Sequence, residues 1–176
     1  AAERGQFRYH CCIREYQSGR RRDGESGVGL QRKGINMIRT ELREHIFKLL
    51  FQEEFNREED MQEHLKYYFM TLENAADKDK DYIQEKYEAV AGHIAEIDEL
   101  INQYAKGWKT TRMNKVDLAI LRLAVYEMKW DEEVPVGVAI NEAVELAKRF
   151  SGGDSPSFIN GVLGKIARSA DGDETK

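Results

Sequence analysis

Proline, cysteine and long apolar runs are scarce in this sequence, and each scarcity excludes a class of protein. Two prolines and 34% charged residues in a chain of 176 are typical of a helix-rich, water-soluble protein. No run approaches the ~18 apolar residues that span a membrane, and no apolar stretch marks a signal peptide. The two cysteines, Cys11 and Cys12, are adjacent, so they form neither a disulfide framework nor a metal-ligand pair. We therefore expect a cytoplasmic protein with no membrane partner.

Catalytic and metal-binding motifs are also missing. The four histidines, at 10, 45, 64 and 93, are isolated from one another and from the cysteines, which leaves zinc chemistry without ligands. There is no GxGxxG, P-loop or nucleophile-elbow pattern. Acidic clusters such as Asp131-Glu132-Glu133 are more typical of solvated loop charge than of an acid/base pair. The sequence predicts a binding protein with no enzyme activity, no cofactor and no metal.

Positive charge is concentrated at the start of the chain. Residues 1–43 carry ten Lys/Arg and five Asp/Glu, whereas residues 44–176 carry seventeen and twenty-seven. A contact with nucleic acid must therefore be local and depend on a few positioned cations. The alternative is that the basic excess is only a solvated tail.

Residues 1–36 are poor in the side chains that build a core. They hold six glycines and only four aliphatic residues, too few to offset the entropy of ordering the chain. We expect this segment to be disordered, followed by a helical domain over 37–170 and a tail over 171–176. Met37 stands just before the first periodic segment, so we hypothesise that it is the biological start, which intact-mass analysis of the native protein would test.

Apolar residues recur at steps of three and four through the rest of the chain, the spacing of helices with one buried face. The spacing predicts helices over residues 37–55, 58–73, 79–105, 116–130, 135–150 and 156–170. The segment 116–130 is apolar nearly all round and should occupy the centre of a bundle. Ser155 is expected to cap the last helix, with Pro156 at its first position. The predicted fold is all-α, with six helices or slightly more.

Gly161 interrupts the last predicted helix. Glycine costs roughly 1 kcal/mol relative to alanine inside a helix, so we expect a packing reason for it. A close approach to a neighbouring helix would supply one, and Gly161→Leu would then destabilise the fold.

Three C-terminal segments occur in a specific order and spacing: "VDLAILRLAVYEM", "VPVGVAINEAVELAKRF" and "SPSFINGVLGKI". Together they resemble the NusB family of bacterial transcription antitermination factors. The first helix, "RTELREHIFKLLFQ", is similar to the family's opening Arg-x-x-x-Arg-Glu helix. The resemblance extends from residue 37 to about residue 168.

The resemblance implies a compact helical bundle of two three-helix subbundles. It implies binding of boxA RNA together with NusE, which is also protein S-ten of the small ribosomal subunit. That complex modifies the RNA polymerase elongation complex for antitermination, notably on ribosomal RNA operons. No enzyme activity or cofactor comes with the family.

The resemblance also implies an RNA-facing surface. The basic start of the family's first helix matches Arg39 and Arg43, which lie four residues apart and would hold consecutive phosphates from one helical face. The family's RNA-facing corner matches Asp154, Ser157 and Phe158. Phe158 would stack on an unpaired base or, alternatively, belong to the core. Asp154 would accept hydrogen bonds from base edges or lead the helix cap.

Asp117 and Arg122 interrupt the otherwise apolar segment 116–130. The resemblance places the matching positions near the RNA and partner surface. The alternative is a structural ion pair within or between helices, because a buried charge needs a partner.

A second function from another class stays open. Thr40, Glu41 and Leu42 stand where several family members have further arginines, and the body of the chain is acidic. These features favour a protein-binding helical adaptor or a homodimer that lacks sequence-specific RNA recognition.

Overall fold

The computed structural model describes residues 36–56 and 58–171. These ranges contain seven α-helices, one short 3-10 helix and no β-strand. The helices are α2 (Arg39–Glu53), α3 (Glu58–Thr71), α4 (Asp77–Ala91), α5 (Ile94–Tyr104), η1 (Thr110–Arg112), α6 (Lys115–Trp130), α7 (Val136–Phe150) and α8 (Ser155–Asp171). The predicted all-α fold is confirmed. The segment expected to be disordered, residues 1–36, lies outside the described residues except for Asn36. Most of the predicted tail, residues 171–176, also lies outside them.

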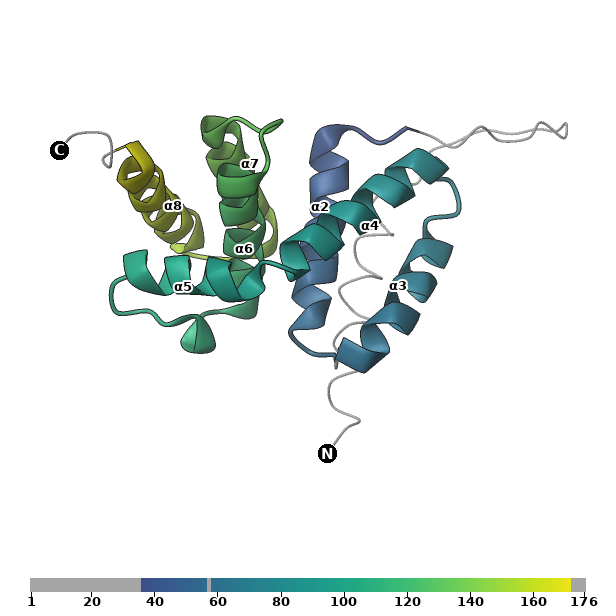
Figure 1. Ribbon diagram of the computed structural model, residues 1–176, viewed down its shortest axis with the longest axis horizontal. Coiled ribbons are helices and arrows are strands. Elements are labelled where there is room, and N and C mark those ends of the chain that lie inside the picture. The colour runs from purple at the N-terminus through teal and green to yellow at the C-terminus, as the bar shows by residue number, and fades with distance from the viewer. Residues whose placement is uncertain (1–35, 57, 172–176) are drawn as a thin grey trace, which may run out of the picture. The chain divides into compact units, whose positions relative to one another are not determined.

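The single helix predicted over residues 79–105 is wrong, because α4 and α5 are separate helices. The amide of Gly92 donates to the carbonyl of Glu88 at 3.0 Å and closes α4. His93 then leaves the helical conformation, with φ −109° and ψ 5°, and Figure 1 shows the chain changing direction there. Glycine is a weak helix former, but the apolar spacing continues through Val90, Ile94 and Ile97, so periodicity alone does not reveal the break.

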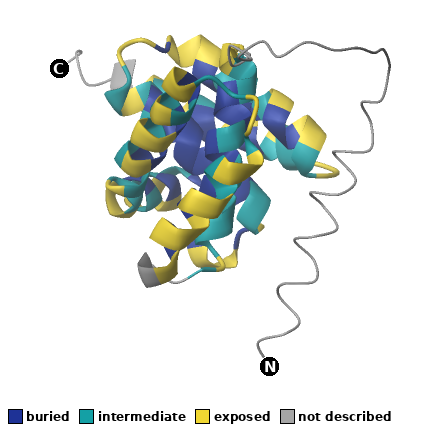
Figure 2. Ribbon diagram, turned by 90° about the vertical axis from the view of Figure 1, so that its right-hand side faces the viewer, coloured by how far each residue is buried: buried dark blue, intermediate teal, exposed yellow. Residues whose placement is uncertain are grey.

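Helix α6 lies at the centre of the fold, as predicted. Ten of its 16 residues are buried, and it packs against α2, α4, α5, α7 and α8. Figure 1 shows α2, α3 and α4 together on one side, with α5, α7 and α8 on the other. Figure 2 shows the buried residues gathered where the helices face one another. The two expected groups of helices are therefore present. Counted with α6, the second group contains four helices in the described residues, one more than expected.

Gly161 has no packing role, so the close approach expected from the sequence is wrong. The residue is exposed, and a Cβ atom built on it meets no other atom within 4 Å. The inward face of α8 instead carries Ile159, Val162 and Leu163, which are all buried. Gly161 follows Ile159 by two residues, about 200° around a helix, and so points away from the core.

Gly161→Ala should therefore stabilise the protein, by about 0.5–1 kcal/mol, because alanine restricts the unfolded chain and fits the open space. The measurement is the midpoint of urea unfolding. Gly153→Ala is the matched control: it also faces open space, but Gly153 has φ +56°, which alanine adopts only with strain. Loss of stability in Gly161→Ala, or a gain in both variants, would contradict this account.

Candidate nucleic-acid interface

The two arginines expected to form one cationic face are separated by the fold. Arg39 is the first residue of α2, and its side chain is 69% exposed, with its guanidinium 3.9 Å from Glu133. Arg43, one turn later, is only 7% exposed. A spacing of four residues puts both side chains on one side of α2, but other helices cover that side at Arg43. Arg39 alone of this pair faces solvent.

Arg43 connects α2 to α6 and α7. Its Nε donates to both carboxylate oxygens of Glu127, at 2.9 and 3.1 Å, and its Nη1 donates to Glu142 at 3.2 Å. Burial raises the pKa of the Glu127 carboxyl, and the Arg43 guanidinium opposes that rise. The guanidinium of Arg43 is thus occupied by two carboxylates within the protein.

Arg122 forms a second internal ion cluster, on the part of α6 nearer its start. Its Nε and Nη2 donate to the two oxygens of Asp98, each at 2.8 Å, in a bidentate pair. Its Nη1 pairs with Glu54, which follows the last residue of α2. Burial lowers the pKa of Arg122, but the two carboxylates raise it above its ordinary value. Arg122 therefore holds α2, α5 and α6 together.

Asp117 organises the corner between α7 and α8. Its Oδ1 accepts a hydrogen bond from the Ser151 hydroxyl at 2.7 Å, and its Oδ2 accepts one from Ser155 at 2.9 Å. Ser155 was predicted to precede the last helix as its cap, but α8 begins at Ser155. The carbonyl of Asp154 accepts from the amide of Phe158 at 3.0 Å, so Asp154 occupies the cap position. The hydroxyl of Ser155 is turned inward to Asp117 instead.

The corner presents three of the predicted residues. Asp154 and Ser157 are exposed, and Phe158 is half-buried. The ring of Phe158 packs against the core, and it also meets the indole of Trp108 edge-on, with 6.1 Å between ring centroids. Phe158 is therefore packed partly against the core, and the stacking of a base on its ring stays a prediction. Sequence reasoning missed Trp108, although an aromatic residue within the basic connection "WKTTR" was a signal for it.

The predicted contact residues fall at the two ends of α6. Arg39 approaches Glu133, just beyond the end of α6, whereas the corner is bound to Asp117 in its first turn. A helix of 16 residues is about 24 Å long. A groove of about 450 Å³ runs along α7 from Gly137 to Lys148 and is closed on the α8 side by Pro156, Ser157 and Asn160.

Comparison with known proteins identifies the family to which this chain belongs. The family model described as "NusB family" matches residues 40–168. The transcription antitermination protein NusB of Agathobacter rectalis is 48% identical over 131 residues, which are 74% of this chain and 100% of that protein. The chain belongs to the NusB family. The expected antitermination family is confirmed, and with it the interpretation that the chain is not an enzyme.

Solved NusB structures share this fold. The structure of NusB from T. maritima is 34% identical, has a TM-score of 0.68, and is matched over 76% of this chain and 93% of its own. A structure of NusB and NusE in complex with dsRNA is 24% identical, with a TM-score of 0.66, over 74% of this chain and 96% of its own. At that identity the second likeness concerns the fold alone.

The described residues also lack a metal-binding cluster and a membrane-spanning helix. No group of three or more His, Cys, Asp or Glu side chains in 36–56 and 58–171 is placed to hold a metal ion. No helix in the same ranges is long and apolar enough to cross a membrane.

Replacing Arg43 by Met should destabilise the fold by about 3–5 kcal/mol, because it leaves the buried Glu127 carboxylate without its cation. Chemical denaturation measures the loss. The double variant Arg43→Met/Glu127→Met removes both charges, so it should recover a large part of that stability. If Arg43→Met unfolds at the same denaturant concentration as the parent, the guanidinium does not hold α2 to α6.

Proposed function

We propose that this NusB-family chain is a transcription antitermination factor. It binds the boxA element of ribosomal RNA transcripts together with NusE, ribosomal protein S-ten, and assists readthrough by the RNA polymerase elongation complex in the bacterial cytoplasm. The observation that carries the proposal is the 48% identity to a transcription antitermination protein over that protein's whole length. The solved complex of a NusB with NusE and dsRNA supports the choice of partner.

The predicted residues fall into an exposed group and a buried group, and we assign a different role to each. Arg39, Asp154, Ser157 and Phe158 have solvent-accessible side chains, and we assign them to direct RNA contact. Arg39 pairs with a phosphate, Phe158 with the face of an unpaired base, and the two polar residues of the corner with base edges. Arg43, Asp117 and Arg122 are buried, so they position this surface from beneath.

The distance between the contact residues supports an extended single strand as the ligand. The ends of α6 lie about 24 Å apart, which is about seven nucleotides at the 3.4 Å rise of a stacked strand. The groove along α7 leads from Gly137, near the Arg39 end, toward Ser157 at the corner. The groove is lined by one lysine, Lys148, and one glutamate, Glu145. We therefore expect the RNA affinity of the chain alone to be modest and simultaneous contact by NusE to strengthen it.

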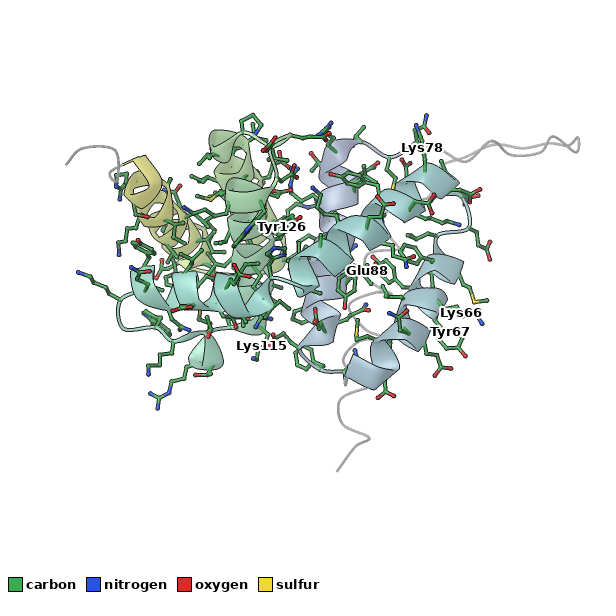
Figure 3. All side chains as sticks on the ribbon, in the orientation of Figure 1. Lys66, Tyr67, Lys78, Glu88, Lys115 and Tyr126 are labelled. Carbon is green, nitrogen blue, oxygen red and sulfur yellow. The ribbon has the colours of Figure 1, made fainter. Side chains whose placement is uncertain are left out.

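A mobility-shift assay at fixed salt tests the proposal. The parent should bind boxA RNA more tightly than a scrambled RNA, and NusE should increase the difference. Arg39→Ala should weaken binding and reduce the slope of log K against log salt by about 0.7, because one phosphate contact with a single strand is lost. Lys66→Ala is the matched control, since Lys66 is exposed on α3, far from α7 and α8 in Figure 3.

Equal affinity of the parent for boxA and scrambled RNA, with and without NusE, would contradict the proposal of sequence-specific RNA binding. Light scattering after size exclusion then separates the remaining candidates. A homodimer or a stable complex with NusE in the absence of RNA would favour the protein-binding adaptor. Two of the predicted RNA-binding cations, Arg43 and Arg122, are buried. This burial favours the protein-binding adaptor as the second candidate, because fewer of the predicted cations can reach RNA.

A further inference from the structure

We propose that Trp108 is a second base-stacking residue and that the exposed cations around it, Lys106, Lys109 and Arg112, bind the adjoining phosphates. The ligand is the single-stranded RNA of the proposed function, on which this inference rests. The four residues belong to the connection between α5 and α6. They extend the RNA surface from the corner past Phe158, and no predicted contact residue lies in this segment.

The connection between α5 and α6 has a hydrogen-bonded, defined conformation that fixes the position of Trp108. The side chain of Asn102 accepts a hydrogen bond from the amide of Thr110 at 2.9 Å and donates to the Thr110 hydroxyl at 3.1 Å. Between them, Gly107 adopts φ +85°, and the amide of Trp108 donates to the carbonyl of Ala105 at 3.0 Å. A surface that is ordered before binding loses less conformational entropy when the ligand arrives.

The indole of Trp108 is placed on the surface rather than in the core. It is 58% exposed, whereas the other tryptophan, Trp130, is half-buried and stacks on Tyr126. Its protein neighbour is the ring of Phe158, which it meets edge-on at 61°. The two rings thus form one aromatic surface, and Ser157 and Asp154 of the corner adjoin it. A strand that stacks a base on Phe158 would bring a neighbouring base to Trp108.

The charges beside Trp108 favour a nucleic acid as the occupant. Lys106, Lys109 and Arg112 are exposed, and residues 105–112 contain no acidic side chain, although the whole chain has a net charge of −5. Aromatic rings interleaved with cations are the usual surface for single-stranded nucleic acids, because bases stack on the rings and phosphates pair with the cations. The surface therefore matches both components of a single strand.

Affinity for boxA RNA, measured in the presence of NusE, tests the inference. Trp108→Ala should weaken binding about 5- to 150-fold, the usual range for one stacked base, while Trp108→Phe should retain most of the affinity. Tyr67→Ala is the matched control, because Tyr67 is also 58% exposed but lies on α3, on the opposite side of Figure 3 from α5. Thermal unfolding of each variant separates lost contacts from lost folding.

Fluorescence reports the stacking directly. In the variant Trp130→Phe, Trp108 is the remaining tryptophan of the chain, and stacking on a base should quench its emission as boxA RNA is added. The cations should act separately from the ring. Lys109→Ala with Arg112→Ala should flatten the salt dependence by about 1.4 in slope, about 0.7 for each phosphate contact with a single strand, and Trp108→Ala should leave that slope as it is.

The outcomes distinguish this inference from the proposed function. If Trp108→Ala binds as the parent does, while Arg39→Ala binds more weakly, the RNA function stands and the role of Trp108 is overturned. If Trp108→Ala loses affinity for NusE and keeps its affinity for RNA, the surface binds protein and the inference is again overturned. If the parent itself does not distinguish boxA from scrambled RNA, the proposed function fails first. Quenching by RNA together with selective weakening in Trp108→Ala supports the inference.

Discussion

The need to pair the charges of the central helix determines how the other helices meet. Helix α6 carries Asp117, Arg122 and Glu127 into the interior, where an ion without a partner costs several kcal/mol. The partners come from elsewhere in the chain: two serines of the α7–α8 corner for Asp117, Asp98 and Glu54 for Arg122, and Arg43 for Glu127. Apolar contacts supply most of the attraction between the helices, but these pairs allow few alternative arrangements.

The same pairing connects the interior to the surface that we assign to RNA. Asp117 fixes both serines of the corner, so Asp154, Ser157 and Phe158 are presented from a rigid base. Arg43 fixes the first turns of α2 and so determines where Arg39 stands. A residue can therefore influence RNA binding without touching the ligand. Comparing the stability of a variant with its affinity is the way to tell these two roles apart.

Most of the fold could be predicted because periodicity reveals which side of a helix is buried. Periodicity failed at Gly92, where the apolar spacing continues across a change of direction. It also failed to separate Arg39 from Arg43, because the carboxylates that cover Arg43 lie 84 and 99 residues away in sequence. Trp108 was not predicted for another reason: an irregular connection has no period. Its defined conformation is seen in the structure, in hydrogen bonds such as those between Asn102 and Thr110.

An acidic protein that binds RNA must obtain its selectivity from something other than charge. The affinity gained by counterion release grows with the number of phosphates that the protein neutralises, and the whole chain has a net charge of −5. Stacking on aromatic rings depends little on salt, and it requires bases that are not already stacked and paired in a duplex. We therefore expect the proposed surface of Phe158 and Trp108 to favour single strands over duplexes. We expect the remaining affinity to come from a second protein that contacts the same RNA. An acidic bundle then suits the role of an adaptor better than that of an independent RNA-binding protein.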